Sequence, residues 1–293
     1  MKLKLISTKV LPGIVSASGI EFYNDKFYII SDDSAWLFIL DKKLSLVEKI
    51  PLLKKKKLTE ERIPKKHKPD LEAMTFATIR GENILFIFGS GSKLKKREKL
   101  FVVFPERNHV VQEFSLAELY NTMFGKDRKD TTLNIEAAAA NDNEFFLVHR
   151  GNISGRNMTW NFDLEPFADF VMKKKRKHPL SGFRVYDLPQ FKKLTAGFSG
   201  AAMLGKKRIL FSASVEDTES VIDDGSILGS FIGIMNTEKS EYTCELLRKN
   251  NRIQKLKVES VCLKKSQGKV HTIYAVTDSD GGNSKLLEIE LNE

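Results

Sequence analysis

The sequence contains little cysteine and no long hydrophobic run. Its 293 residues include only two cysteines, Cys244 and Cys262, and no CxxC or Cys/His spacing, which disfavours a disulfide framework and a zinc site. Both lie in apolar, strand-like runs, so we expect two buried free thiols. No stretch approaches the roughly 18 apolar residues of a membrane span. Lysines and hydroxyl residues interrupt the N-terminal segment before it resembles an export signal. We therefore expect a cytoplasmic protein that does not enter a membrane.

Glycine and proline are also scarce, with 18 and 8 residues, which excludes a collagen-like or low-complexity chain. Hydrophobic residues make up 41% and charged residues 29% of the sequence, as in a globular protein. Lysine and arginine exceed the acidic residues, and the formal net charge is +10.

A short motif recurs along the chain at intervals of about 60 residues, the length of a propeller blade. Each copy precedes two or three further runs that are rich in Ile, Val, Phe and Tyr and bounded by Asn, Asp, Gly and Lys, which is typical of strands. The copies are SGIEF from Ser18, LEAMTF from Leu71, IEAAAA from Ile135, SGAAML from Ser199 and VESVCL from Val258.

Four antiparallel strands per repeat predict an all-β fold, a single β-propeller domain over residues 1–293. The last repeat stops after three strands, and KLKLISTKV near the N-terminus is a strand without a repeat. Together they would complete one blade and close a ring of five blades, with a sixth, degenerate blade as the alternative. A β-sandwich is the rival fold, but it does not explain the constant order of the runs. Helices are expected only at 115–125 and 164–175.

The longest connections are predicted to share one face of the disc-shaped propeller. In each blade the first, innermost strand begins on that face and the second strand ends on it. Long loops clustered at one end of a rigid scaffold favour a functional site there. These connections span 53–70, 90–98, 117–134, 152–180 and 216–229.

Acidic residues recur at the start of the innermost strands, next to the mouth of the central channel. Aligning the motifs gives equivalent positions to Gly19, Glu72, Glu136, Gly200 and Glu259. Neighbouring oxygen groups come from Asp70 and Asn134, and the ends of the second strands add Asp32, Ser90, Arg150 and Asp278, with Asp33, Glu216, Asp217 and Asp280 close by.

Carboxylates gathered in a concave site repel one another, so some take up protons with raised pKa values or a cation neutralises them. Oxygen ligands without cysteine favour Ca²⁺, with Mg²⁺ as the alternative. We expect Glu72, Glu136, Glu259 and Asp70 to bind the metal. In the competing interpretation the three Glu residues bond to backbone N–H groups of the next blade and hold the ring together. Arg150 is an internal counter-ion that competes with a metal for the carboxylates.

The motifs DLEA from Asp70, NIEA from Asn134 and VES from Val258, each followed by an apolar strand, resemble those of the phytase-like propellers. The likeness extends to the esterase-like, SdiA-regulated members and covers nearly the whole chain. It implies a propeller with an acidic, Ca²⁺-binding central mouth. Gly19 and Gly200 depart from the pattern, since the family would have Glu there.

Basic runs at 54–57, 65–68, 93–99 and 173–178 are all predicted on the same rim. A basic collar around an acidic floor would attract an anionic small molecule, and Lys93, His149 and Ser90 are placed to contact it. The runs lack the interleaved aromatic residues that stack on bases, which disfavours nucleic acid as a partner.

These patterns together predict a divalent-metal-dependent hydrolase of phosphoesters, esters or lactones at the channel mouth. In that mechanism the metal polarises a phosphoryl or carbonyl oxygen, Asp32 or Asp278 activates water, and Arg150 assists. The alternative is a non-enzymatic propeller that binds an anionic small molecule or a protein on its basic rim, with structural Glu residues in the channel.

Overall fold

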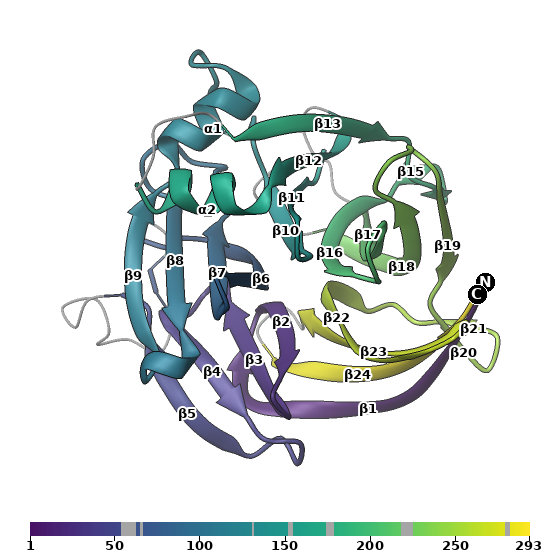
Figure 1. The fold of residues 1–293 in the computed structure, drawn as a ribbon. Helices are drawn as coiled ribbons and strands as arrows, with labels where there is room; N and C mark the ends of the chain where they lie inside the picture. Colours follow the sequence, from purple (N-terminus) through teal and green to yellow (C-terminus); the bar gives the residue numbers. More distant parts are fainter. Residues whose placement is uncertain are drawn as a thin grey trace.

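The computed structural model of the chain describes residues 1–53, 63–64, 67–130, 132–151, 155–173, 179–217, 225–278 and 282–293. Within these residues, five four-stranded antiparallel sheets surround a central axis (Figure 1). The predicted five-bladed β-propeller is therefore confirmed. In the first four blades the chain begins with the innermost strand and runs outward, whereas the outermost strand of the fifth blade is the N-terminal one.

The first three blades follow one another directly in sequence. They consist of β2 (Ala17–Tyr23), β3 (Lys26–Ser31), β4 (Trp36–Leu40) and β5 (Leu46–Pro51), then β6 (Leu71–Ile79), β7 (Glu82–Gly89), β8 (Lys99–Phe104) and β9 (Val110–Ser115), then β10 (Ile135–Ala140), β11 (Glu144–His149), β12 (Asn157–Asp163) and β13 (Leu180–Tyr186).

The last two blades contain the longest strands. They consist of β16 (Gly197–Met203), β17 (Arg208–Asp217), β18 (Ser226–Asn236) and β19 (Tyr242–Leu246), then β22 (Lys257–Gln267), β23 (Val270–Asp278), β24 (Asn283–Asn292) and β1 (Lys2–Val15). Two small ribbons, β14 (Gln190–Phe191) with β15 (Leu194–Thr195) and β20 (Arg248–Lys249) with β21 (Arg252–Ile253), lie before β16 and β22.

The N-terminal strand closes the ring, as the sequence predicts. β1 pairs with β24 in antiparallel register from Lys2 opposite Asn292 to Val15 opposite Asn283, so the two termini lie side by side at the outer edge of blade five (Figure 1). The strand extends five residues beyond the predicted Val10, with a register irregularity between Val10 and Val15.

Blade three differs from the sequence prediction. Its third strand is β12, which lies inside the segment predicted as one rim loop at 152–180, and GFRVYD forms the fourth strand β13 rather than the third. Both predicted helices exist but are shorter, α1 (Ala117–Phe124) and α2 (Leu164–Val171). Because α2 follows β12, the basic run at 173–178 follows a third strand and not a second.

The core consists of apolar side chains packed between neighbouring blades, because the inner strands are buried on both faces. Between blades two and three, Phe167 of α2 stacks on Phe145 with ring centroids 4.2 Å apart and also contacts Phe86 and Phe88. Burial of one such ring stabilises the fold by about 1.5 to 3 kcal/mol. Helix α2 therefore packs into the space between these blades and stabilises their contact. Cys262 is buried as predicted, whereas Cys244 is only half-buried, and both are free thiols.

A β-bulge at the same place in every inner strand aligns the blades. The register shifts pass over Ser18, Glu72, Glu136, Ser199 and Glu259. The equivalents of the three Glu residues in blades one and four are therefore Ser18 and Ser199, and the alignment of Gly19 and Gly200 with them is wrong by one residue. In each inner strand the bulge therefore lies near the end of the strand at the channel mouth, and it interrupts the regular alternation of side chains there.

Candidate functional site at the channel mouth

Acidic side chains from all five blades or their connections gather where the inner strands begin. Asp32 follows β3, Asp70 precedes β6, and Glu216 lies near the end of β17. The bulge positions add Glu72, Glu136 and Glu259, and Asp33 follows Asp32. The fold brings these carboxylates together at one mouth of the channel, as the sequence predicts. The first strand of every blade starts, and the second strand ends, on the face where this mouth lies.

The carboxylates of Asp32, Asp70 and Glu72 form the tightest acidic group. One oxygen from each lies within 4.8 Å of the others, close enough to share a metal ion. The Asp32 Oδ1 atom is buried and has no hydrogen-bond partner, and no side chain of the described residues donates a hydrogen bond to the carboxylate of Glu72. Two of the three side chains therefore have oxygen atoms whose bonding capacity is unused.

Asp70 is held in place by several donors. Ser90 Oγ donates to its Oδ2 atom at 2.5 Å, and Arg97 Nη1 lies 2.7 Å from the same atom. Ser92 Oγ approaches Oδ2 at 3.3 Å. The backbone of Asp70 has φ +58°, a left-handed conformation that Asp tolerates better than most residues. Asp70 is thus oriented by contacts to Oδ2, while its Oδ1 lies 4.0 Å from the ammonium of Lys68.

Lys68 inserts its ammonium among the carboxylates of blades one and two. It forms an ion pair with Asp32 Oδ2 and lies 2.9 Å from Asp33 Oδ1 and 4.0 Å from Asp70 Oδ1. Burial alone would lower the pKa of Lys68, but Asp32, Glu72 and Asp70 together raise it. The side chain therefore stays charged and acts as a counter-ion inside the mouth.

The other half of the mouth is a network of ion pairs. Arg150 Nη2 lies 2.6 Å from Glu216 Oε1 and Arg150 Nη1 lies 3.9 Å from Glu136 Oε2. Lys257 Nζ lies 3.0 Å from Glu259 Oε1 and 3.6 Å from Glu216 Oε1. A Cβ atom at Gly197 would lie 2.7 Å from Arg150 Nε, so the glycine leaves room for the arginine.

Charge and burial raise the pKa values of the mouth carboxylates. Burial is the main cause for Asp32, Glu136 and Glu259, whose pKa rises to about 7, and for Glu72, whose pKa rises well above its ordinary value. Burial also acts on Glu216, but Arg150 and Lys257 outweigh it and lower its pKa. Among the described residues, seven carboxyl groups of the mouth face four cationic side chains, Lys68, Arg97, Arg150 and Lys257. The raised pKa values mean that several of these carboxyl groups hold protons near neutral pH unless a further cation neutralises them.

The structure separates the predicted metal ligands into two groups. Asp70 and Glu72 join Asp32 in the tight acidic group, whereas Glu136 and Glu259 pair with Arg150 and Lys257 instead. No backbone N–H of the described residues donates to these three Glu carboxylates. Two serines instead form hydrogen bonds between neighbouring blades. Ser18 Oγ donates to the Leu71 carbonyl at 2.5 Å, and Ser199 Oγ donates to the Val258 carbonyl at 2.6 Å.

The residues predicted to bind substrate lie in different surroundings. Ser90 is fully buried and supports Asp70. His149 is buried against Phe124, accepts a hydrogen bond from the Asn134 N–H, and has its pKa lowered to about 4 by burial. Lys93 is exposed on the rim. Substrate binding by these residues stays a prediction.

Asp278 ends β23 opposite Lys257 at the start of β22, at the edge of the mouth. Asp217 ends β17 and is exposed, one residue beyond Glu216. The predicted oxygen group of Asp280 and most of the basic runs, namely residues 54–57, 65–66 and 174–178, lie outside the described residues.

Sequence reasoning did not single out Lys68 and Lys257, the two lysines of the mouth. Both stand at even spacing from an acidic inner-strand residue, in KPDLE from Lys68 and KVE from Lys257. Alternate residues of an extended strand share a face, so the spacing in KVE is a signal that could have found Lys257. The left-handed backbone of Asp70 breaks this alternation between Lys68 and Glu72, so the spacing gives no such signal for Lys68. Arg97 was assigned to the rim collar, but its guanidinium points onto Asp70.

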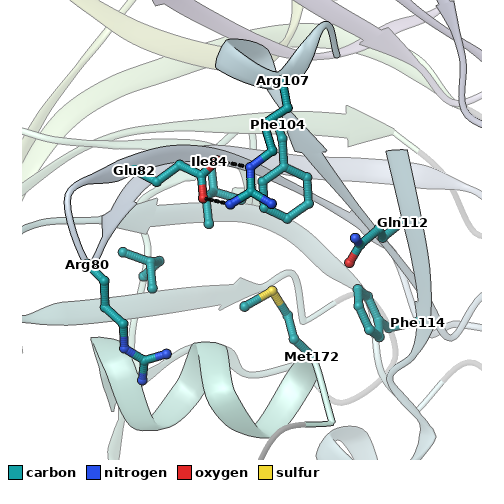
Figure 2. Close-up of a pocket in the computed structure, with 9 residues that line it drawn as sticks. Arg80, Glu82, Ile84, Phe104, Arg107, Gln112, Phe114 and Met172 are labelled. Atoms are coloured by element: carbon teal, nitrogen blue, oxygen red, sulfur yellow. Dashed lines mark hydrogen bonds and ion pairs between the residues drawn. The ribbon is translucent and has the colours of Figure 1, made fainter. Parts of the chain in front are cut away.

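A groove of about 500 Å³ lies at the other ends of β6 to β9, away from the mouth (Figure 2). Its floor is apolar and includes Ile84, Phe104 and Met172. The two arginines on its rim are already paired, Arg107 with Glu82 and Arg80 with Asp169. The groove therefore offers no cluster of reactive side chains, and the mouth remains the candidate site.

Among the described residues, neither helix has the length and hydrophobicity that a membrane-spanning helix needs.

Comparison with known proteins gives the fold and a family. The structure is similar to glutaminyl cyclase from Myxococcus xanthus, with a TM-score of 0.53 and 9% identity over 99% of this chain and 96% of that one. It is also similar to the tail fibre of Staphylococcus aureus phage P68, with a TM-score of 0.48 and 10% identity over 100% and 53% of the two chains. An exo-1,5-α-L-arabinanase from a bovine ruminal metagenomic library gives a TM-score of 0.47 and 11% identity over 96% and 93%.

At 9% identity the likeness to the glutaminyl cyclase shows the fold alone. No curated protein sequence gives a significant match. Neither the family match nor these structures show that the chain is a phytase-like propeller, so that resemblance of the motifs stays a prediction. Residues 13–291 match the family of unknown function DUF6929, and the chain therefore belongs to the DUF6929 family.

Proposed function

We propose that this protein is a hydrolase that binds a divalent cation at the channel mouth and cleaves an anionic phosphoester, ester or lactone there. The observation that carries the proposal is the group of Asp32, Asp70 and Glu72. Their oxygen atoms lie within 4.8 Å of one another, and the buried Asp32 Oδ1 has no partner. Burial of unneutralised oxygen atoms is costly, and a cation would remove that cost.

The donor set fits a hard cation. Three carboxylates without sulfur or imidazole favour Ca²⁺ or Mg²⁺ over zinc, and we propose Ca²⁺ first, in line with the resemblance of the motifs to phytase-like propellers. Compared with the sequence prediction, Asp32 takes the place of Glu136 and Glu259 as a ligand. When bound, the cation would polarise a phosphoryl or carbonyl oxygen of the substrate.

The other half of the mouth supplies groups that can move a proton and bind charge. A carboxyl group with a pKa of about 7, such as that of Glu136 or Glu259, exists in both protonation states at neutral pH and can serve as a general acid or base. Arg150 and Lys257 hold positive charge beside these groups. They would orient an anionic oxygen of the substrate toward the acidic group.

Assays of chromogenic phosphoesters, carboxylic esters and lactones test this proposal. We expect turnover of one substrate class that needs added Ca²⁺ or Mg²⁺ and stops with EDTA. Glu72→Gln and Glu136→Gln should abolish it, whereas Glu113→Gln, an exposed carboxylate on β9, should leave it unchanged. Turnover that survives EDTA, or no turnover of any class by the metal-loaded protein, would overturn the proposal.

A second candidate function is binding of an anionic small molecule or a protein on the basic rim without catalysis. Lys93, Lys95 and Lys96 are exposed in the β7–β8 connection and favour this alternative. Under it, Lys93→Glu with Lys96→Glu should abolish binding of inorganic pyrophosphate, and Glu72→Gln should have no effect. The cytoplasmic location predicted from the sequence is part of both proposals.

A further inference from the structure

The position of Lys68 overlaps the group that would bind a divalent cation. Its ammonium pairs with Asp32 Oδ2 and faces Asp70 Oδ1 at 4.0 Å. Asp32 and Asp70 are two of the three carboxylates of the tight acidic group. Only 13% of the Lys68 side chain is exposed, so the lysine belongs to the interior of the mouth and not to its solvated rim.

The other cations of the mouth do not overlap this group in the same way. Arg97 approaches Asp70 through Oδ2, the oxygen that Ser90 also binds. Arg150 and Lys257 pair with carboxylates of the opposite half. Among the described cations, Lys68 is therefore the one that contacts two of the three carboxylates of the acidic group.

A divalent cation and the ammonium of Lys68 would compete for this place. A Ca²⁺ ion needs oxygen ligands at about 2.3 to 2.6 Å, so an ion held by Asp32, Asp70 and Glu72 would lie close to the ammonium, which already contacts two of these carboxylates. Like charges at short range in a buried site repel each other strongly. Binding of the ion is therefore expected to push the ammonium of Lys68 away from the group.

We propose that Lys68 is an internal counter-ion that a divalent cation displaces from Asp32 and Asp70, so that this lysine sets the cation affinity of the mouth. The inference rests on the proposed function, because it concerns the same cation site. Lys68 lies in the connection that leads into β6, and its long flexible stem can carry the ammonium out toward the rim. The ammonium is held by its ion pairs with Asp32 and Asp33, so its release requires a competing cation.

Isothermal titration of the purified protein with CaCl₂ and MgCl₂ tests the competition. We expect Lys68→Met to bind the ion at least about tenfold more tightly than the wild type, a gain of about 1.4 kcal/mol. Lys68→Arg keeps the charge and should show no gain. Lys42→Met is the matched control, because Lys42 pairs with Asp25 at 2.7 Å on the exposed surface, and its affinity should equal that of the wild type.

Amine footprinting gives a readout that does not depend on the variants. Acetylation of each lysine of the wild-type protein is measured by mass spectrometry with Ca²⁺ and with EDTA. Displacement predicts that Lys68 reacts several times faster with Ca²⁺, while Lys42 is unchanged. Equal reactivity of Lys68 under both conditions, in protein that titration shows to bind Ca²⁺, would overturn the inference.

The outcomes separate the inference from the proposed function. If wild type and Lys68→Met bind the ion equally, the competition is wrong and the metal site stands. If only Lys68→Met binds, the competition is right and the wild-type protein is not metal-dependent. If neither binds any divalent ion, both are wrong.

Discussion

The hydroxyl of Ser199 donates a hydrogen bond of 2.6 Å to the carbonyl of Val258, the residue before Glu259 in the next blade. Ser18 makes the same contact to Leu71, the residue before Glu72. Blades with Ser at the bulge thus support the strands that present a Glu at the bulge. At the bulge position, Ser residues therefore form hydrogen bonds between blades, whereas Glu residues contribute carboxylates to the candidate site.

Ser199→Ala should lower the free energy of unfolding by about 1 to 3 kcal/mol, because it leaves the buried Val258 carbonyl without this donor. Urea denaturation followed by fluorescence measures the change. Ser240→Ala, at an exposed position, serves as the control and should change stability by less than about 0.5 kcal/mol. Equal stability of both variants would show that the serine bridge does not hold the blades.

The stability of the metal-free protein should fall as pH rises from about 5 to 8. The carboxyl groups of Glu136 and Glu259 have pKa values of about 7 in the folded protein against 4.5 ordinarily, so the folded state binds more protons across this window. Each lost kcal/mol lowers the melting temperature by about 2 to 4 °C.

Glu136→Gln in EDTA should flatten this pH dependence, because the amide does not titrate. Glu113→Gln, on the exposed outer strand, should not alter it. A melting temperature of the wild type that stays constant or rises between pH 5 and 8 would contradict the buried, protonated state of these groups.

Arg150→Met should destabilise the protein by about 3 to 5 kcal/mol, because it removes the cation beside Glu136 and leaves Glu216 only the longer contact with Lys257, at 3.6 Å. The matched control is Arg208→Met, which breaks an exposed pair with Glu293 at 2.6 Å and should cost about 0 to 1 kcal/mol. Chemical denaturation at pH 7 compares them. Equal losses of unfolding free energy in the two variants would contradict a role of Arg150 as a buried counter-ion of the mouth.

Lys93→Glu combined with Lys96→Glu should raise KM for the anionic substrate with little change in kcat, since exposed charges on the rim steer the substrate and do not touch the reacting atoms. The effect should shrink at high salt. A fall in kcat at unchanged KM would place these lysines in the chemistry.

The fold could be predicted from the sequence because each blade repeats the same order of strand runs. The site was predicted only in outline. The recurring motifs located Glu72, Glu136 and Glu259 at one mouth, but the bulge shifts the register by one residue, so the alignment chose Gly19 and Gly200 where Ser18 and Ser199 stand. A bulge leaves no mark in the alternation of a strand that is apolar on both faces.

The grouping of the charges could not be predicted for a different reason. Whether Glu259 binds a metal or pairs with Lys257 depends on side-chain directions at the mouth. Lys68 and Arg97 belong to basic runs of the rim, and only the path of their loops turns them inward. Long side chains of this kind reach over several ångströms, and sequence spacing does not fix where they end.

The most direct test of the central claim is a thermal-shift titration of the wild type and Glu72→Gln with Ca²⁺, Mg²⁺ and EDTA. A ligand that binds only the folded state stabilises it by about 2.7 kcal/mol at 100 times Kd. The account predicts a rise in melting temperature with one of the ions that EDTA reverses, that Glu72→Gln loses and that Glu113→Gln keeps. No shift with any divalent ion, or a shift that Glu72→Gln retains, would contradict a cation site formed by Asp32, Asp70 and Glu72.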